Sequence, residues 1–271
     1  MRLALSEIST VNASFAEDVV AYAAAGFDAI GIWELKLPAD DAGNLAKLRE
    51  AGLGVANCIP AVPSILQLRI PGLEGPPDPD ERTRALCASV RRFSAYDPDS
   101  VLCLTGPIGD LELVEARRIV VDGLQLLAAA AREAGVRLGL EPIHPRQHDV
   151  ASFVHTVGEA VALLDEAGLD DVGVMVDTYN LWEAPLDELR AYARRVTGVH
   201  VADVPPEPGR NDRVLPGEGG PRARELVATL QAAGWNGTLD VEIFSTPDAF
   251  WCLPVQEAAR RAHAAAASLL V

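Results

Sequence analysis

Lysine is almost absent from this chain. Only Lys36 and Lys47 occur among 271 residues, and the 23 basic residues are outnumbered by 39 acidic ones, which gives a formal net charge of −16. Affinity for nucleic acid rests on neutralising phosphates with Lys and Arg, so this charge balance argues against a nucleic-acid partner. A small, neutral substrate is more compatible with it.

Long apolar runs and paired cysteines are missing as well. No stretch approaches the roughly 20 uninterrupted apolar residues of a membrane span, and the first predicted strand starts too early to leave room for a signal peptide. The four cysteines are scattered without a CxxC spacing, as is typical of reduced core residues. The sequence therefore predicts a soluble, cytoplasmic protein without a membrane partner. The cysteines are Cys58, Cys87, Cys103 and Cys252.

What the chain does contain is a regular alternation of short apolar runs and helical segments. The runs are typical of buried parallel strands, and several helical segments end in Ala-Gly, a helix C-cap signal. Eight such pairs predict a single (β/α)8 TIM barrel over residues 1–271, close to the usual ~250 residues of this α/β fold. The predicted strands are Leu3–Ile8, Ala29–Trp33, Val55–Ile59, Val101–Thr105, Leu138–Glu141, Val172–Asp177, Val199–Ala202 and Leu239–Phe244. The predicted helices are Phe15–Ala25, Ala42–Ala51, Glu81–Ser94, Val114–Ala134, Phe153–Ala167, Leu186–Ala193, Ala223–Ala233 and Val255–Leu270.

Four residues of metal-ligand type stand at the ends of four consecutive predicted strands, namely Glu141, Asp177, His200 and Glu242. In a barrel, the carboxyl ends of neighbouring strands face one cavity, where carboxylates repel one another and lose hydration unless a cation neutralises them. Each residue alone has another interpretation, because strand-end carboxylates often cap the next helix and a strand His is often a hydrogen-bonded core residue. Their joint occurrence predicts a site for Mn²⁺, Mg²⁺, Co²⁺ or Zn²⁺.

Two Pro- and Gly-rich segments, Pro60–Pro79 and Val204–Gly220, follow predicted strands and are expected on the catalytic face. The first contains four apolar residues among its prolines, which is unusual for a solvated loop: Ile65, Leu66, Leu68 and Ile70. Four roles are open for it. It is a lid, a wall for an apolar aglycone, a contact with another subunit, or a loop folded onto its own barrel.

The sequence around the four ligand-type residues carries recognisable motifs. They are LEPIHP at Glu141, VDTYNLW at Asp177, GVHVAD at His200, DRVLPGEG from Asp212 to Gly219 and GTLDVEIF at Glu242. With these motifs the chain resembles the xylose-isomerase-like TIM-barrel superfamily, also called sugar phosphate isomerase/epimerase-like. The resemblance implies that the four residues bind one divalent ion, Mn²⁺ first and Mg²⁺, Co²⁺ or Zn²⁺ as alternatives. It also implies that Arg213, in R-x-x-P-G-x-G, contacts the substrate.

Two departures from the family pattern narrow the choice of activity. Ketose 3-epimerases usually have a His three residues beyond the metal-binding Asp, whereas this chain has Asn180 there. That difference argues against a conventional epimerase pocket and makes Asn180 a candidate substrate contact. Endonuclease IV, another member, builds a three-metal cluster with additional histidines that this sequence lacks at the corresponding motifs. DNA repair is therefore disfavoured.

Two further motifs supply candidate site residues. LEPxHP resembles the metal-binding subunit of C-glycoside deglycosidases, in which a His removes a proton next to a 3-keto group, and this makes His144 a candidate general base. The alternative for His144 is a surface loop histidine. Glu34 and Lys36 follow the second predicted strand, and both are candidate substrate contacts. For Lys36 the reason is that a compact ammonium suits sugar hydroxyls. The alternative for Lys36 is a solvated loop lysine.

The ligand set predicts chemistry at a carbon next to a carbonyl. A divalent ion polarises the carbonyl and stabilises the enediolate formed on deprotonation. The resemblance gives the proton transfers to Glu141 and Glu242 in an epimerase, or to His144 in an elimination. The first hypothesis is a metal-dependent sugar isomerase or epimerase acting on a keto-sugar or cyclitol, with a lyase of the C-glycoside deglycosidase or inosose dehydratase type as its alternative. The second is a non-catalytic barrel that binds a sugar or a partner protein, as a homo-oligomer or with a small partner subunit.

Overall fold

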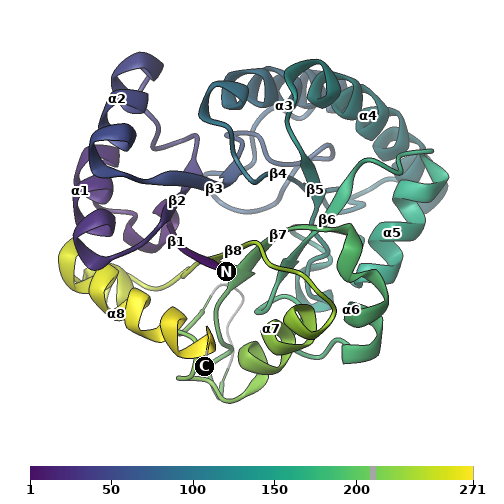
Figure 1. Cartoon of the computed structure of the whole chain (residues 1–271). Coiled ribbons are helices and arrows are strands. Elements are labelled where there is room, and N and C mark those ends of the chain that lie inside the picture. The colour runs from purple at the N-terminus through teal and green to yellow at the C-terminus, as the bar shows by residue number, and fades with distance from the viewer. Residues whose placement is uncertain (208–211, 271) are drawn as a thin grey trace.

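The computed structural model describes residues 1–207 and 212–270 and shows a closed barrel of eight parallel strands (Figure 1). Each strand pairs with the next along the chain, and β1 pairs with β8 to close the ring. The (β/α)8 barrel predicted from the sequence is confirmed. The strands are β1 (Arg2–Ser6), β2 (Ala29–Trp33), β3 (Gly54–Ile59), β4 (Ser100–Cys103), β5 (Leu138–Leu140), β6 (Gly173–Asp177), β7 (Val196–Val201) and β8 (Thr238–Val241).

An α-helix follows each strand, and the helices form a layer around the outside of the barrel (Figure 1). The local sequence explains their ends: Ser14 and Glu17 form a capping box at the start of the first helix, and Gly26 ends it with a φ of 95°. The other four predicted Ala-Gly ends also have left-handed glycines. The helices are α1 (Phe15–Ala25), α2 (Asp41–Ala51), α3 (Pro79–Phe93), α4 (Leu113–Ala134), α5 (Val157–Glu166), α6 (Leu186–Tyr192), α7 (Arg222–Ala232) and α8 (Val255–Ala267).

Several predicted boundaries were wrong by two to four residues; for example, β7 starts at Val196 instead of Val199, and β8 ends at Val241 instead of Phe244. The first strand ends at Ser6 instead of Ile8, because the chain turns into a short 3-10 helix, Glu7–Thr10, at the barrel mouth. Helix α5 starts four residues later than predicted, at Val157. Its start is set by Thr156, whose side chain caps the helix by accepting a hydrogen bond from a backbone N–H of the first turn.

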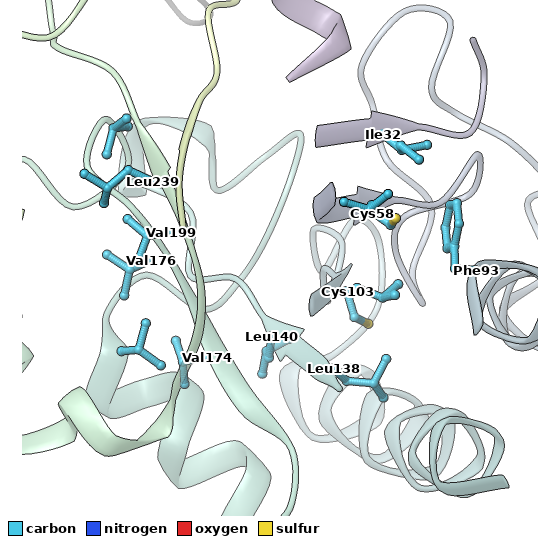
Figure 2. Packing of buried hydrophobic residues seen from close by; sticks show 14 of the residues in the cluster. Ile32, Cys58, Phe93, Cys103, Leu138, Leu140, Val174, Val176, Val199 and Leu239 are labelled. Carbon is cyan, nitrogen blue, oxygen red and sulfur yellow. The ribbon is translucent and has the colours of Figure 1, made fainter. Parts of the chain in front are cut away.

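Residues along each strand alternate between two environments. One set belongs to the main hydrophobic core, and Figure 2 shows three of its members, Val176, Val199 and Leu239, in a row across neighbouring strands. Because successive strand residues point to opposite faces, the next residues along, such as Asp177 and His200, point into the barrel. The same alternation that builds the core therefore directs the ligand-type residues inward.

The apolar part of the Pro60–Pro79 loop folds back onto its own barrel. Ile65, Leu66 and Leu68 are at most 3% exposed. Leu68 joins a small apolar cluster at the barrel mouth that also contains Trp33. Packing on the barrel, one of the four roles open to this loop, is therefore observed.

Three of the four cysteines, Cys58, Cys87 and Cys103, are buried and free, as predicted. Cys252 is exposed, so its prediction as a core residue was wrong; it ends a short 3-10 helix, Phe250–Cys252, that contains no buried residue. Within residues 1–207 and 212–270, we find no helix with the length and apolar character needed to cross a membrane.

Candidate metal centre

The barrel brings the four predicted ligands together at the carboxyl ends of its strands. Asp177 and His200 are direct partners in the β6–β7 register, and Glu141 and Glu242 immediately follow β5 and β8. Ligand atoms of Glu141, Asp177 and His200 lie within 4.8 Å of one another. Glu242 Oε2 lies 3.5 Å from His200 Nδ1. All four residues are at most 4% exposed.

The three carboxyl groups of this cluster lie in an environment that disfavours negative charge. Burial raises the pKa of Glu141 well above its ordinary value of 4.5, and the charges of Asp177 and Glu242 raise it further. Burial also raises the pKa values of Asp177 and Glu242, although the nearby Arg213 opposes these shifts. A divalent cation would offset both the desolvation and the mutual repulsion.

His200 presents a neutral ring to the same cluster. Burial lowers the pKa of its imidazole from 6.5 to about 4, so the ring is uncharged near pH 7. Neither ring nitrogen has a hydrogen-bond partner among the described residues. A neutral imidazole beside buried carboxylates is the form that a divalent metal binds. The residues present therefore fit an ion with oxygen and nitrogen ligands.

Arg213 reaches the cluster from the Val204–Gly220 segment, the loop after β7. Residues 208–211 of this loop lie outside the described part of the chain. Arg213 Nη1 lies 2.9 Å from Asp177 Oδ2 and 2.8 Å from Glu242 Oε2. The guanidinium also lies 4.8 Å from the ring centroids of both Tyr179 and Phe244. Arg213 is thus a fixed cation at the edge of the predicted metal site.

The amide of Asn180 links two of the predicted ligands. Its Nδ2 donates to Glu141 Oε1 at 2.9 Å and to Asp177 Oδ2 at 3.0 Å. Its Oδ1 accepts a hydrogen bond from Gln147 Nε2 at 3.4 Å. Asn180 therefore occupies the position at which the resemblance expects a His, and there it orients carboxylate oxygens.

A pocket opens above the cluster, and its lining is of two kinds. The polar lining residues come from β5 to β8 or the loops that follow them: Glu141, Gln147, Asn180, Arg213 and Glu242. Most of the apolar lining comes from β2 to β4 and the loops after them, and includes Trp33, Leu68, Leu73, Leu102 and Leu104. Phe244, after β8, meets Trp33 edge to face at 5.6 Å between ring centroids. The Pro60–Pro79 loop thus forms part of the pocket wall.

The structure does not bring His144 to this pocket. Its Nε2 lies 3.1 Å from Glu183 Oε2, and its Nδ1 accepts a hydrogen bond from the Arg146 N–H at 3.2 Å. The ring packs against Trp182, with 5.8 Å between centroids. Both ring nitrogens are engaged outside the pocket. The neighbouring Ile143 is among the described lining residues, whereas His144 is not.

Lys36 and Glu34 are also placed outside the described pocket lining. Lys36 Nζ donates to two backbone carbonyls at 2.9 Å each and pairs with the buried Asp18 at 2.5 Å. Glu34 accepts from Ser89 Oγ at 2.6 Å and pairs with Arg92 at 3.4 Å. The structure therefore engages both residues in contacts within the fold, and their contact with substrate stays a prediction.

Asp240 is a residue of the site that the sequence-based interpretation missed. It is fully buried on the inner face of β8, where its Oδ2 accepts from Asn57 Nδ2 at 3.2 Å and lies 3.8 Å from His200 Nε2. Burial raises the pKa of Asp240 well above 3.8, and the charge of Glu242 adds to the shift. A signal was available, because residues two apart on a strand share a face, so Asp240 must point inward with Glu242.

Comparison with known proteins places this site in context. A family model described as xylose isomerase-like TIM barrel matches residues 19–269. A 3-dehydroshikimate dehydratase from Pseudomonas putida is 28% identical over 268 residues, which cover 92% of this chain and 39% of that protein. The chain thus spans about two fifths of the length of this curated relative.

Solved structures share the fold over its whole length. A structure of IOLI protein with a bound zinc atom has a TM-score of 0.81 and 19% identity, covering 100% of this chain and 98% of that one. D-psicose 3-epimerase in the presence of D-fructose has a TM-score of 0.76 and 17% identity, covering 99% and 98% of the two chains. At these identities the similarity shows the barrel architecture.

Proposed function

We propose, from the premise that this chain belongs to the xylose isomerase-like TIM barrel family, that it is a divalent-metal-dependent enzyme of sugar chemistry. The proposed reaction removes a proton from the carbon next to the carbonyl of a keto-sugar or cyclitol and continues to isomerisation or epimerisation. The observation that carries the proposal is the buried cluster of Glu141, Asp177 and His200, whose ligand atoms lie within 4.8 Å of one another.

The ion would be held by these three residues together with Glu242. Three carboxylates and one imidazole form a mostly oxygen donor set, which suits Mn²⁺ or Mg²⁺ better than metals that prefer thiolates, and we propose Mn²⁺ first. When bound, the ion supplies a Lewis acid that polarises a carbonyl and stabilises the charge that develops as the adjacent C–H loses its proton. Asn180 holds the carboxylates of Glu141 and Asp177 in register for this role.

Glu141 and Glu242 are the proposed proton-transfer groups. Both line the pocket, and they reach it from the ends of different strands, β5 and β8. Asn180 and Arg213 each donate to one oxygen of these carboxylates, at 2.9 and 2.8 Å, which fixes their orientation. Proton removal by one and return by the other on the opposite face gives epimerisation, whereas return to the neighbouring carbon gives isomerisation.

The pocket lining favours a substrate without a phosphate group. Arg213 is the one Lys or Arg among the described lining residues, and its Nη1 is already shared by Asp177 and Glu242. A phosphoryl group is usually recognised by several charge-assisted hydrogen bonds, which this lining does not supply. Trp33 and Phe244 instead offer apolar surface to the C–H face of a ring. We therefore propose an unphosphorylated keto-sugar or cyclitol, bound through its oxygens at the polar side.

A lyase is the second candidate, because the curated relative is a dehydratase. Elimination starts with the same proton abstraction and ends with loss of a leaving group from the next carbon. Since His144 lies outside the pocket, Glu141 and Glu242 are also the proposed bases for this reaction. Release of water or of an aglycone distinguishes the lyase from the isomerase.

The test combines metal analysis with solvent deuterium exchange. We expect about one divalent ion per chain, and we expect deuterium to enter the substrate carbon next to the carbonyl of a ketose, inosose or 3-keto-glycoside. Chelation should abolish this exchange, re-addition of Mn²⁺ should restore it, and Glu141→Gln should reduce it at least ~10²-fold. A folded protein that binds no divalent ion contradicts the proposal. Metal and sugar binding without exchange on any of these substrates would identify a non-catalytic barrel.

A further inference from the structure

We infer that Asp240 is a positioning residue of the metal centre, which holds the proton of His200 on Nε2 and so directs Nδ1 toward the ion. The inference rests on the proposed metal site and adds a residue that touches neither ion nor substrate. His200 lies between two carboxyl groups, with Nδ1 3.5 Å from Glu242 Oε2 and Nε2 3.8 Å from Asp240 Oδ2.

The two ring nitrogens of His200 have different surroundings. Glu242 lies on the Nδ1 side, and Arg213 Nη1 joins Glu242 to Asp177 at 2.8 and 2.9 Å. An ion bound by these two carboxylates and by His200 would therefore be met by Nδ1 without a proton. The proton of the neutral ring then sits on Nε2 and faces Asp240, the arrangement in which a carboxylate orients a metal-binding histidine.

Asp240 is also the acceptor with spare capacity. Glu242 Oε2 already accepts a hydrogen bond from Arg213, whereas Asp240 Oδ1 has no partner among the described residues. The gap of 3.8 Å between His200 Nε2 and Asp240 Oδ2 is longer than a hydrogen bond. A shift of the ring by less than about 1 Å brings the two atoms into range.

The barrel interior is shaped to hold this carboxylate. A Cβ on Gly31 would lie 2.2 Å from Asp240 Oδ2, so β2 makes room for Asp240 by having glycine there. A Cβ on Gly198 would lie 2.3 Å from Oδ1 of Asn57, the residue that donates to Asp240. A buried carboxylate costs stability unless it is compensated. The inferred role of Asp240 in orienting His200 would explain why the barrel contains this carboxylate and has glycines that make room for it.

Asp240→Asn tests the inference with little change in side-chain size. Asn57 Nδ2 and His200 Nε2 both approach Oδ2 of Asp240, at 3.2 and 3.8 Å, so the amide oxygen keeps that place. A neutral amide oxygen is a weaker acceptor than a carboxylate, so the ring proton is held less firmly on Nε2. The tautomer with the proton on Nδ1, which cannot bind the ion, becomes more populated. We expect the Mn²⁺ dissociation constant, measured by competition with a chelator, to rise about 10- to 100-fold. Unchanged Mn²⁺ affinity in Asp240→Asn overturns the inference.

Glu7→Gln is the matched control, because Glu7 is another fully buried carboxylate whose Oε2 accepts from the Trp33 N–H. The substitution makes the same change from carboxyl to amide at a place that does not face His200, so the Mn²⁺ dissociation constant should change less than about twofold. An equal loss of Mn²⁺ affinity in both variants would show that any buried carboxyl-to-amide change weakens binding, and it would overturn the role of Asp240.

Nitrogen-15 NMR of the histidine rings gives a second readout that needs neither metal nor activity. The chain has five histidines, and the His200 signal is the one that disappears in His200→Gln. In the metal-free parent we expect the proton on Nε2, and in Asp240→Asn a shift toward Nδ1. A parent with the proton on Nδ1 overturns the inference even where Asp240→Asn fails to fold. Absence of Mn²⁺ binding in the parent would instead contradict the proposed function.

Discussion

His144 and Glu141 are three residues apart in one motif, yet their side chains lie in different surroundings. Glu141 lines the pocket within the ligand cluster, whereas His144 is held outside it by Glu183 and Arg146. We therefore expect Glu141→Gln to lower kcat by about 10²- to 10⁴-fold, and His144→Asn to lower it by less than about threefold. The rate of solvent deuterium incorporation into the substrate compares the two variants directly.

The control for this comparison is metal content. Both variants must be measured with Mn²⁺ at saturation, because Glu141 is also a predicted ligand and its substitution weakens binding of the ion. A loss of 10²-fold or more in His144→Asn with the ion still bound would show that the loop rearranges to bring the imidazole to the substrate. The elimination mechanism started by His144 would then be the better description.

At the scale of secondary-structure elements, Lys36 joins three parts of the barrel. From the loop after β2 it donates to two carbonyls of the 3-10 helix after β1, and it pairs with Asp18 of α1, which is fully buried. Removing one partner of a buried pair leaves the other charge uncompensated. We expect Lys36→Met to lower the free energy of unfolding by about 3–5 kcal/mol, measured by urea denaturation.

The chain offers a matched control for this substitution, because its other lysine, Lys47, is exposed on α2. Lys47→Met should change the free energy of unfolding by less than about 0.5 kcal/mol. Unchanged stability of Lys36→Met together with a raised KM would return Lys36 to the substrate site predicted from the sequence.

What could be predicted from the sequence depends on the range of the interactions involved. The barrel and the convergence of its ligand-type residues follow from the alternation along each strand and from closure of eight such units, both of which are local patterns. What the sequence could not predict is a side-chain contact with a distant segment. His144 bonds to Glu183, 39 residues away, and Asp240 to Asn57, 183 residues away. No periodicity of the sequence marks such a pair before the fold brings its members together.

At the scale of the whole molecule, the acidic character of the surface continues into the barrel. The chain has a net charge of −16, and the mouth of its barrel buries the carboxyl groups of Glu141, Asp177 and Glu242 beside Arg213. An ion that binds this folded site and not the unfolded chain stabilises the fold as a whole. The stability of the protein is therefore expected to depend on metal and on pH together.

We predict that the stabilisation by Mn²⁺ grows as the pH rises from about 5 to about 8. In the metal-free protein the pKa values of the three carboxyl groups are raised, so stability is lost as the pH climbs through these raised values. Bound Mn²⁺ requires the deprotonated carboxylates and compensates their charge, so it restores stability over the same range. His200 does not oppose this trend, because with a pKa of about 4 it stays neutral throughout.

The magnitude can be measured from melting temperatures with and without the ion. At 100 times its dissociation constant Mn²⁺ contributes about 2.7 kcal/mol, which raises the Tm of a chain of this size by roughly 5–10 °C near pH 8. Asp177→Ala is the control: it removes a ligand within the cluster and should show no Mn²⁺-dependent change in Tm at any pH. An increase as large at pH 5 as at pH 8 would mean that the ion binds elsewhere, because a site made of these carboxylates must compete with protons for its ligands.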